Sequence, residues 1–143
     1  MKKYALIGIT GLISFGSFAQ KLKEKEVPTA VVSTFHKQFP QAKELKWEKE
    51  NGNYEVEFDL NKTETSALFD GTGKLLETET EIQINQLPDG ILSHVKANYK
   101  GQKIKEAAKI TDSNGVVMYE AEIKGKDLIF DANGIFIKEL DNH

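Results

Sequence analysis

The chain has 143 residues, a formal net charge of −3 at pH 7 and no cysteine. Without cysteine there is no disulfide framework, so stability has to come from an ordinary hydrophobic core. The positive charges are all lysines. The lack of arginine and the net acidic balance count against a nucleic-acid partner, because such recognition relies on bidentate arginine contacts and a positive stripe.

Residues 1–19 have the pattern of a secretory signal peptide. Lys2 and Lys3 give a positive start, an uncharged run continues to Phe18, and Ala19 is a small residue at the cleavage position. We therefore expect cleavage before Gln20, with a polar N-terminal segment at 20–26. An N-terminal membrane anchor is the alternative, although the apolar run is short for a span. The expected location is the periplasm or the cell exterior, with no membrane attachment after cleavage.

The rest of the chain repeats itself with a period of about sixty residues, which indicates two tandem structural units. The first repeat covers 27–82 and the second covers 83–143. Tyr54 to Phe58 in the first copy corresponds to Tyr119 to Ile123 in the second. Each copy also contains Phe-Asp-x-x-Gly, at 69–73 and at 130–134.

Each copy is predicted to begin with an amphipathic helix. Pro28 and Pro88 suit a first helical turn, where a missing N–H group costs nothing. Apolar residues then recur at helical spacing and form one stripe on each helix. We expect Pro40 to end the first helix and Gly101 to end the second. The stripes consist of Val27, Val31, Val32, Phe35 and Phe39 in the first copy and of Leu87, Ile91, Leu92, Val95 and Tyr99 in the second.

After each helix the apolar residues alternate with polar ones, which indicates four antiparallel strands per copy. The fold class is therefore α+β, with two tandem helix-plus-four-stranded antiparallel sheet units and both helices packed on one face of a curved sheet. A linker is expected at 78–86. The expected strands are 44–48, 54–60, 65–69 and 74–80, then 103–111, 116–124, 127–130 and 135–140.

This pattern resembles the PepSY-like, β-lactamase-inhibitor-like domain (BLIP/PepSY-like) of small secreted Bacteroidetes proteins. The resemblance rests on Trp47, Tyr54, Asp70 and Gly73, and on their counterparts Tyr119, Asp131 and Gly134. The second copy departs from the pattern, with Ala107 at the position of Trp47. The resemblance implies a periplasmic or secreted domain with a concave sheet face, and the wider PepSY group implies restraint of a peptidase. It does not imply β-lactamase inhibition.

The alternation places charged residues on the sheet face opposite the helices. We interpret them mainly as a solvated outer face with cross-strand Lys–Glu pairs, with binding of a cation as the alternative. Trp47 is interpreted as a core residue, with an interface anchor as the alternative. The candidate binding face consists of Lys46, Glu48, Glu55, Glu57, Glu77, Glu79, Glu120 and Glu122.

Catalytic, metal and cofactor motifs are missing from the sequence. His36 and His94 lie at the edges of the helical stripes without the spacing of a metal motif, and the serines lack a nucleophile elbow. The Asp70 and Asp131 loops have a weak likeness to calcium loops, but Asp before Gly is ordinary turn chemistry. We expect a non-enzymatic binding module for a protein or peptide partner, which could modulate an envelope peptidase. The alternative is a small-ligand or cation-binding periplasmic protein.

Overall fold

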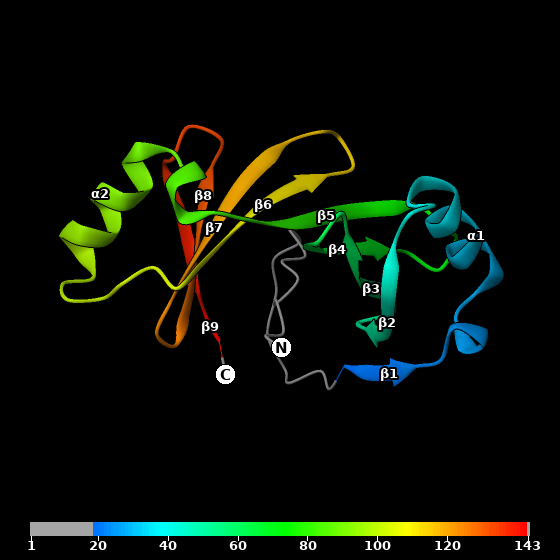
Figure 1. The fold of residues 1–143 in the computed structure, drawn as a ribbon. Coiled ribbons are helices and arrows are strands. Elements are labelled where there is room, and N and C mark those ends of the chain that lie inside the picture. Colours follow the sequence, from blue (N-terminus) through cyan, green and yellow to red (C-terminus); the bar gives the residue numbers. More distant parts are fainter. Residues whose placement is uncertain (1–18, 143) are drawn as a thin grey trace.

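The computed structural model describes residues 19–142, so the predicted signal peptide falls almost wholly outside the described residues (Figure 1). The α-helices are α1 (Thr29–Gln38) and α2 (Asp89–Asn98), and each follows a short 3-10 helix, η1 (Glu24–Glu26) or η2 (Ile84–Gln86). The strands are β1 (Gln20–Leu22), β2 (Lys43–Glu50), β3 (Asn53–Leu60), β4 (Thr63–Phe69), β5 (Leu75–Ile82), β6 (Glu106–Asp112), β7 (Val117–Ile123), β8 (Lys126–Asp131) and β9 (Phe136–Asp141).

The strands form one continuous nine-stranded sheet in sequence order, and every neighbouring pair is antiparallel. This corrects the expectation of two four-stranded units in two respects. The polar segment after Ala19 forms β1, which pairs with β2 through Leu22 and Trp47. The expected linker begins inside β5, and β5 pairs with β6 from Glu77 to Ile82. The two repeats are therefore joined by backbone hydrogen bonds.

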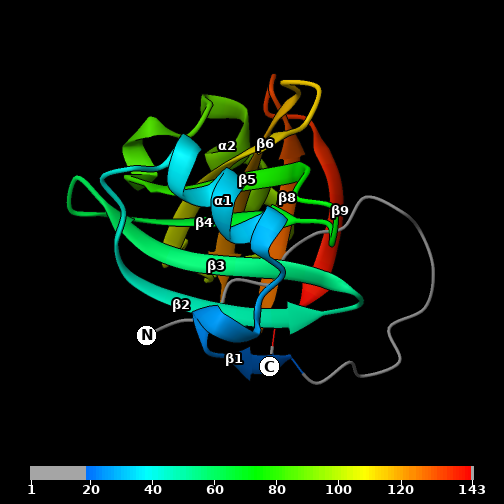
Figure 2. The same cartoon turned by 90° about the vertical axis from the view of Figure 1, so that its right-hand side faces the viewer.

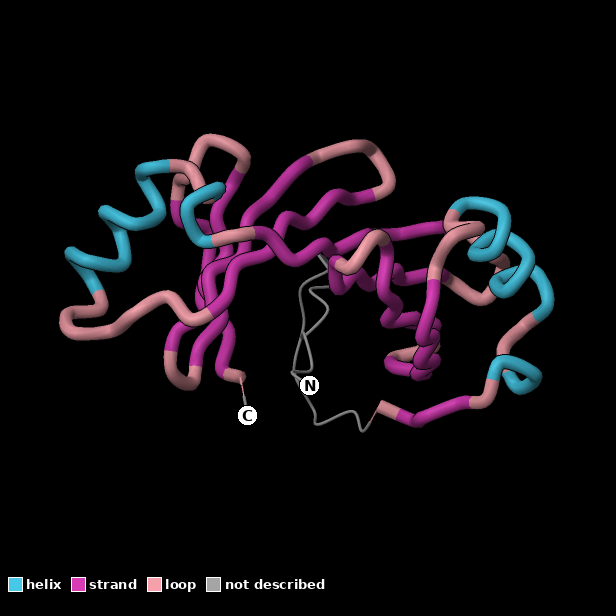
Figure 3. Tube along the Cα trace, viewed as in Figure 1, coloured by secondary structure: helices cyan, strands magenta, loops and turns pink. Residues whose placement is uncertain are grey.

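The sheet bends into an arch, and both α-helices lie on its outer, convex side (Figures 1 and 2). Figure 3 shows the strands as the body of the arch and the two helices at its outer shoulders. The inner side of the arch is covered by no helix or strand of residues 19–142. We call this inner side the concave face and define its residues below.

Two hydrophobic cores lie between the helices and the convex side of the sheet, one in each repeat. In the first, Val31 and Phe35 of α1 pack on Trp47, Val56 and other residues of β2 to β4. In the second, Ile91 and Val95 of α2 pack on their β6 to β8 counterparts. The predicted helical stripes thus face the sheet, because burying them there removes their apolar surface from water. Leu92 is the exception, since it was predicted in the second stripe but is exposed.

The Asp-x-x-Gly segments are tight turns between strands. Asp70 Oδ1 accepts the backbone N–H groups of Thr72 and Lys74, and Asp131 makes the equivalent contacts in the second repeat. Gly73 has φ +89°, and a Cβ atom there would lie 2.6 Å from the carbonyl oxygen of Ala30 in α1. Glycine at this position therefore permits both the turn and its close contact with the helix.

Candidate functional site

The concave face consists of the strand residues that point away from the helices. Strand register places all eight candidate binding residues on it. Glu48 lies opposite Glu55, and Lys46 lies opposite Glu57. Leu68 lies between Glu55 and Glu77, and Ser66 lies between Glu57 and Glu79. In the second repeat, Glu120 and Glu122 lie on the same face, opposite Ala108 and Glu106.

The structure adds further carboxylates to this face, which sequence analysis did not single out. The register pairs Asp59 with Glu64 in the first repeat, and Asp112 with Glu77 across the junction of the repeats. The lysines of the face lie near the two ends of the sheet, with Lys21 in β1, Lys46 in β2 and Lys138 in β9. In the described strands β3 to β8, the charged side chains of this face are all carboxylates. They are Glu55, Glu57, Asp59, Glu64, Glu77, Glu79, Glu81, Glu106, Asp112, Glu120, Glu122, Asp127 and Asp131.

Several of these carboxylates are buried, which differs from the expected solvated face. The exposed fraction is 2% for Glu79 and for Glu120, and 4% for Glu55. Both carboxylate oxygens of Glu79 lack a hydrogen-bond partner in the structure.

Burial raises the pKa values of these groups, because removal from water disfavours the charged form. The pKa of Glu55 is raised to about 9, first by burial and then by repulsion from Glu57 and Glu48. The pKa of Glu77 is raised to about 7 by burial and by Asp112, against an opposing effect of Lys138. At neutral pH, Glu55 therefore carries a proton in the folded chain.

The pKa values of Glu120 and Glu79, at the centre of the face, are raised as well. The pKa of Glu120 is raised to about 8, mainly by burial and then by Asp127. The pKa of Glu79 is raised well above its ordinary value by burial and by the charge of Glu120. Crowding like charges in a shielded place costs free energy, and a positively charged partner would relieve that cost.

Apolar side chains lie among the carboxylates in the second repeat. Ile110, Met118 and Ile129 form a third cluster, with Leu140 packed against it. The register runs from Glu79 to Ile110 to Met118, so the cluster adjoins the central carboxylate. Ile110 and Ile129 have no exposed surface and Met118 is 5% exposed, so the cluster is packed within the chain.

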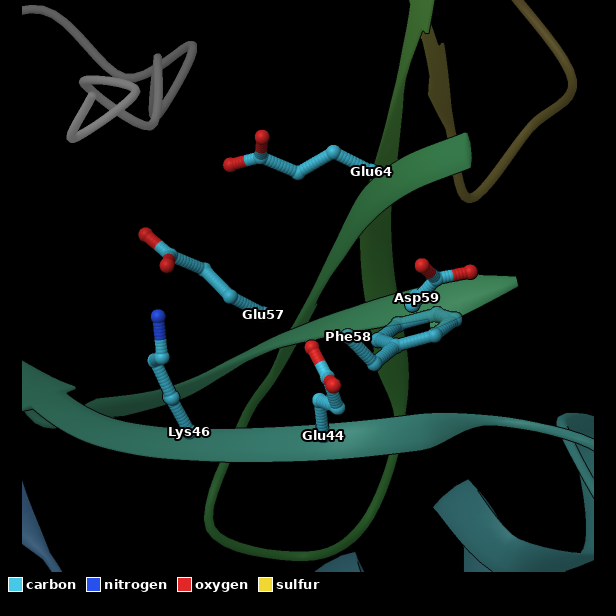
Figure 4. Close-up of a pocket in the computed structure, with 6 residues that line it drawn as sticks. All are labelled: Glu44, Lys46, Glu57, Phe58, Asp59 and Glu64. Atoms are coloured by element: carbon cyan, nitrogen blue, oxygen red, sulfur yellow. The ribbon is translucent and has the colours of Figure 1, made fainter. Parts of the chain in front are cut away.

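A shallow hollow of about 200 Å³ lies at the first-repeat end of the concave face (Figure 4). In Figure 4, Lys46 and Glu57 reach into the same space from adjacent strands. Typical small-molecule sites have volumes of about 300–1000 Å³, so this hollow is small for a ligand pocket. Its lining residues are Glu44, Lys46, Glu57, Phe58, Asp59 and Glu64.

Trp47, His36 and His94, which the sequence analysis also considered, make contacts within the fold. Trp47 is 4% exposed and packs edge-on against Phe35 in the first core, so little of its ring is offered to a partner. His36 contacts Glu24 at 2.9 Å, and His94 stacks on Phe136.

Two further observations concern metal and membrane. Within residues 19–142, no group of three or more His, Cys, Asp or Glu side chains is arranged to hold a metal ion. None of the helices in that range is long and apolar enough to cross a membrane.

The fold and its open concave face define a class of small proteins in which helices cover one side of an antiparallel sheet. Residues 17–76 and 59–138 each match the model of a family described as β-lactamase-inhibitor-like and PepSY-like. The chain belongs to this PepSY-like family, which confirms the resemblance seen in its sequence motifs. A comparison with curated proteins gives no match.

Solved structures with the same fold come from Bacteroides species. One is described as a proposed periplasmic protein of Bacteroides eggerthii, with TM-score 0.72 and 13% identity, over 80% of this chain and 88% of that one. A DUF2874 family protein of Bacteroides uniformis gives TM-score 0.71 and 18% identity, over 80% and 89%. A BLIP-like protein of Bacteroides fragilis gives TM-score 0.65 and 24% identity, over 80% of this chain and 86% of that one. At these identities the likeness shows the fold alone.

Proposed function

We propose that this chain is a non-enzymatic binding module of the periplasm or the cell exterior, and that its concave face contacts a protein or peptide partner. One observation carries the proposal: the face gathers carboxylates, several of them crowded and buried, yet no described helix or strand covers it. A partner that supplies positive charge and hydrogen bonds to such groups would stabilise them. The signal-peptide pattern and the periplasmic description of a structural neighbour support the location.

The partner class follows from the family rather than from a particular side chain. The PepSY resemblance implies an envelope peptidase, which the module would restrain by occupying a surface of it. The alternative function is binding of a small ligand or a cation. The hollow in Figure 4 is small for a ligand, whereas two open hollows of about 510 and 720 Å³ adjoin Lys62. The described residues form no metal-ligand group.

Site-specific cross-linking tests the proposal, because the chain contains no cysteine and each introduced cysteine is therefore unique. A photo-activated cross-linker is attached at Glu57→Cys or Glu122→Cys on the concave face. Matched controls carry it at Lys37→Cys or Lys96→Cys, on the exposed sides of α1 and α2. Each labelled protein is exposed to a native envelope extract, and cross-linked proteins are identified by mass spectrometry.

The proposal predicts that one partner is cross-linked from both concave-face positions and from neither helix position. Cross-links from the helix positions alone would move the interface to the convex side and contradict the proposal. Absence of a specific cross-link from every position would contradict the binding function itself.

A further inference from the structure

We infer that the partner segment bound by the concave face is cationic, with Lys or Arg side chains among the carboxylates of that face. This inference rests on the proposed function and names the chemistry of its partner. It follows from two observations: the segregation of charge and the unpartnered Glu79.

The segregation of charge is not a consequence of composition. The whole chain has 22 Asp and Glu residues and 19 positive residues, close to balance. Strands β3 to β8 nevertheless place carboxylates, and no lysine, on the described concave face, while Lys109 and Lys126 of the same strands lie on the other side. A face of one charge attracts the opposite charge and repels its own.

This charge pattern separates a cationic segment from the other occupants of such a face. A second copy of the chain would bring an identical acidic face and be repelled. An anionic lipid surface and a nucleic acid would be repelled for the same reason. A cationic protein segment is the macromolecular occupant that this face attracts.

Glu79 provides the second observation, at the centre of the sheet. It belongs to β5, the strand that pairs with the second repeat, and it is 2% exposed. Neither of its oxygens has a hydrogen-bond partner, and the charges that raise its pKa are those of other carboxylates, led by Glu120. A buried carboxyl group without a partner is costly, and a Lys or Arg side chain placed beside it would supply hydrogen bonds and charge together.

Binding of three synthetic peptides tests the inference, with fluorescence anisotropy as the measurement. The probes are short peptides of alternating Lys and Leu, of alternating Lys and Ser, and of alternating Glu and Leu. The protein is the chain from Gln20 to His143, which contains every described helix and strand. We expect both lysine peptides to bind and the Glu–Leu peptide not to bind, because the face attracts positive charge and repels negative charge.

Matched double variants then locate the binding. Glu57→Gln with Glu122→Gln removes two charges from the concave face, and Glu24→Gln with Glu139→Gln removes two from outside it. The first pair should weaken Lys–Leu binding about fivefold, since an exposed ion pair contributes about twofold to threefold. The second pair should change the affinity for the Lys–Leu peptide by no more than about twofold. Circular dichroism confirms that both variants are folded.

The outcomes separate this inference from the proposed function. Tight binding of the Glu–Leu peptide would overturn the cationic partner while leaving a binding module in place. Equal weakening by both double variants would show unspecific charge attraction and overturn the inference. No binding of any peptide would also overturn it, and the cross-linking experiment decides the proposed function independently.

Discussion

Replacing Phe35 with alanine should strongly destabilise the protein. Its side chain is fully buried at the centre of the first core. Loss of a buried phenylalanine side chain costs about 3–5 kcal/mol of folding stability. Because Phe35 also makes several aromatic contacts, we expect a cost of about 4 kcal/mol. For a domain of this length, that loss lowers the melting temperature by about 15 °C. The ring centroids nearest to Phe35 are those of Phe58 at 5.1 Å, His36 at 5.2 Å, Trp47 at 5.3 Å, Phe39 at 5.6 Å and Phe69 at 6.4 Å.

Thermal unfolding followed by circular dichroism measures this loss, and amide hydrogen exchange shows how far it spreads. Because β5 pairs with β6, weakening the first repeat should also reduce exchange protection in β7 and β8 of the second. Lys37→Ala, on the exposed side of the same helix, is the control and should shift the midpoint by about 2 °C or less. A midpoint for Phe35→Ala equal to that of the control would refute the packing of α1 on the sheet.

Three further predictions concern turns and buried charge. Gly73→Ala should cost about 2 kcal/mol more than Gly52→Ala in a urea titration, since both have positive φ but only Gly73 would clash with Ala30; equal costs would contradict the close approach. Asp131→Ala should cost about 1–2 kcal/mol through its two lost N–H contacts, and an unchanged urea midpoint would argue against them. The folded pKa of Glu55, about 9, exceeds its unfolded value, so the stability that this group contributes is complete below about pH 4.5 and is lost as pH rises toward 9. Glu55→Gln should therefore be more stable than wild type near pH 9 and flatten this dependence, whereas parallel pH profiles would contradict the raised pKa.

The helices and most strands could be predicted from the sequence because their apolar spacing is strong. α1 begins at Thr29 after Pro28 and ends just before Pro40, close to the expected limits. The strand β1 was not predicted, since Gln20 to Leu22 is too short and polar to show alternation. The extension of β5 beyond Thr80 was missed because Thr and Glu alternate there, so the period-two pattern lacks an apolar signal.

The concave face was predicted in membership but not in environment. Alternation alone assigns Glu55, Glu79 and Glu120 to one side of the sheet, as observed. Their burial is set by tertiary surroundings, which leave no mark on the local spacing of residues. The same limit applies to the apolar cluster at Ile110, whose members come from three different strands.

The most direct test of the account compares the amount of partner cross-linked from the concave face with the amount cross-linked from the convex side, in a native envelope extract. The account predicts that Glu57→Cys captures a specific partner and that Lys37→Cys, on the opposite side of the same repeat, does not. Capture of the same partner from Lys37→Cys alone would contradict the assignment of the concave face as the binding surface.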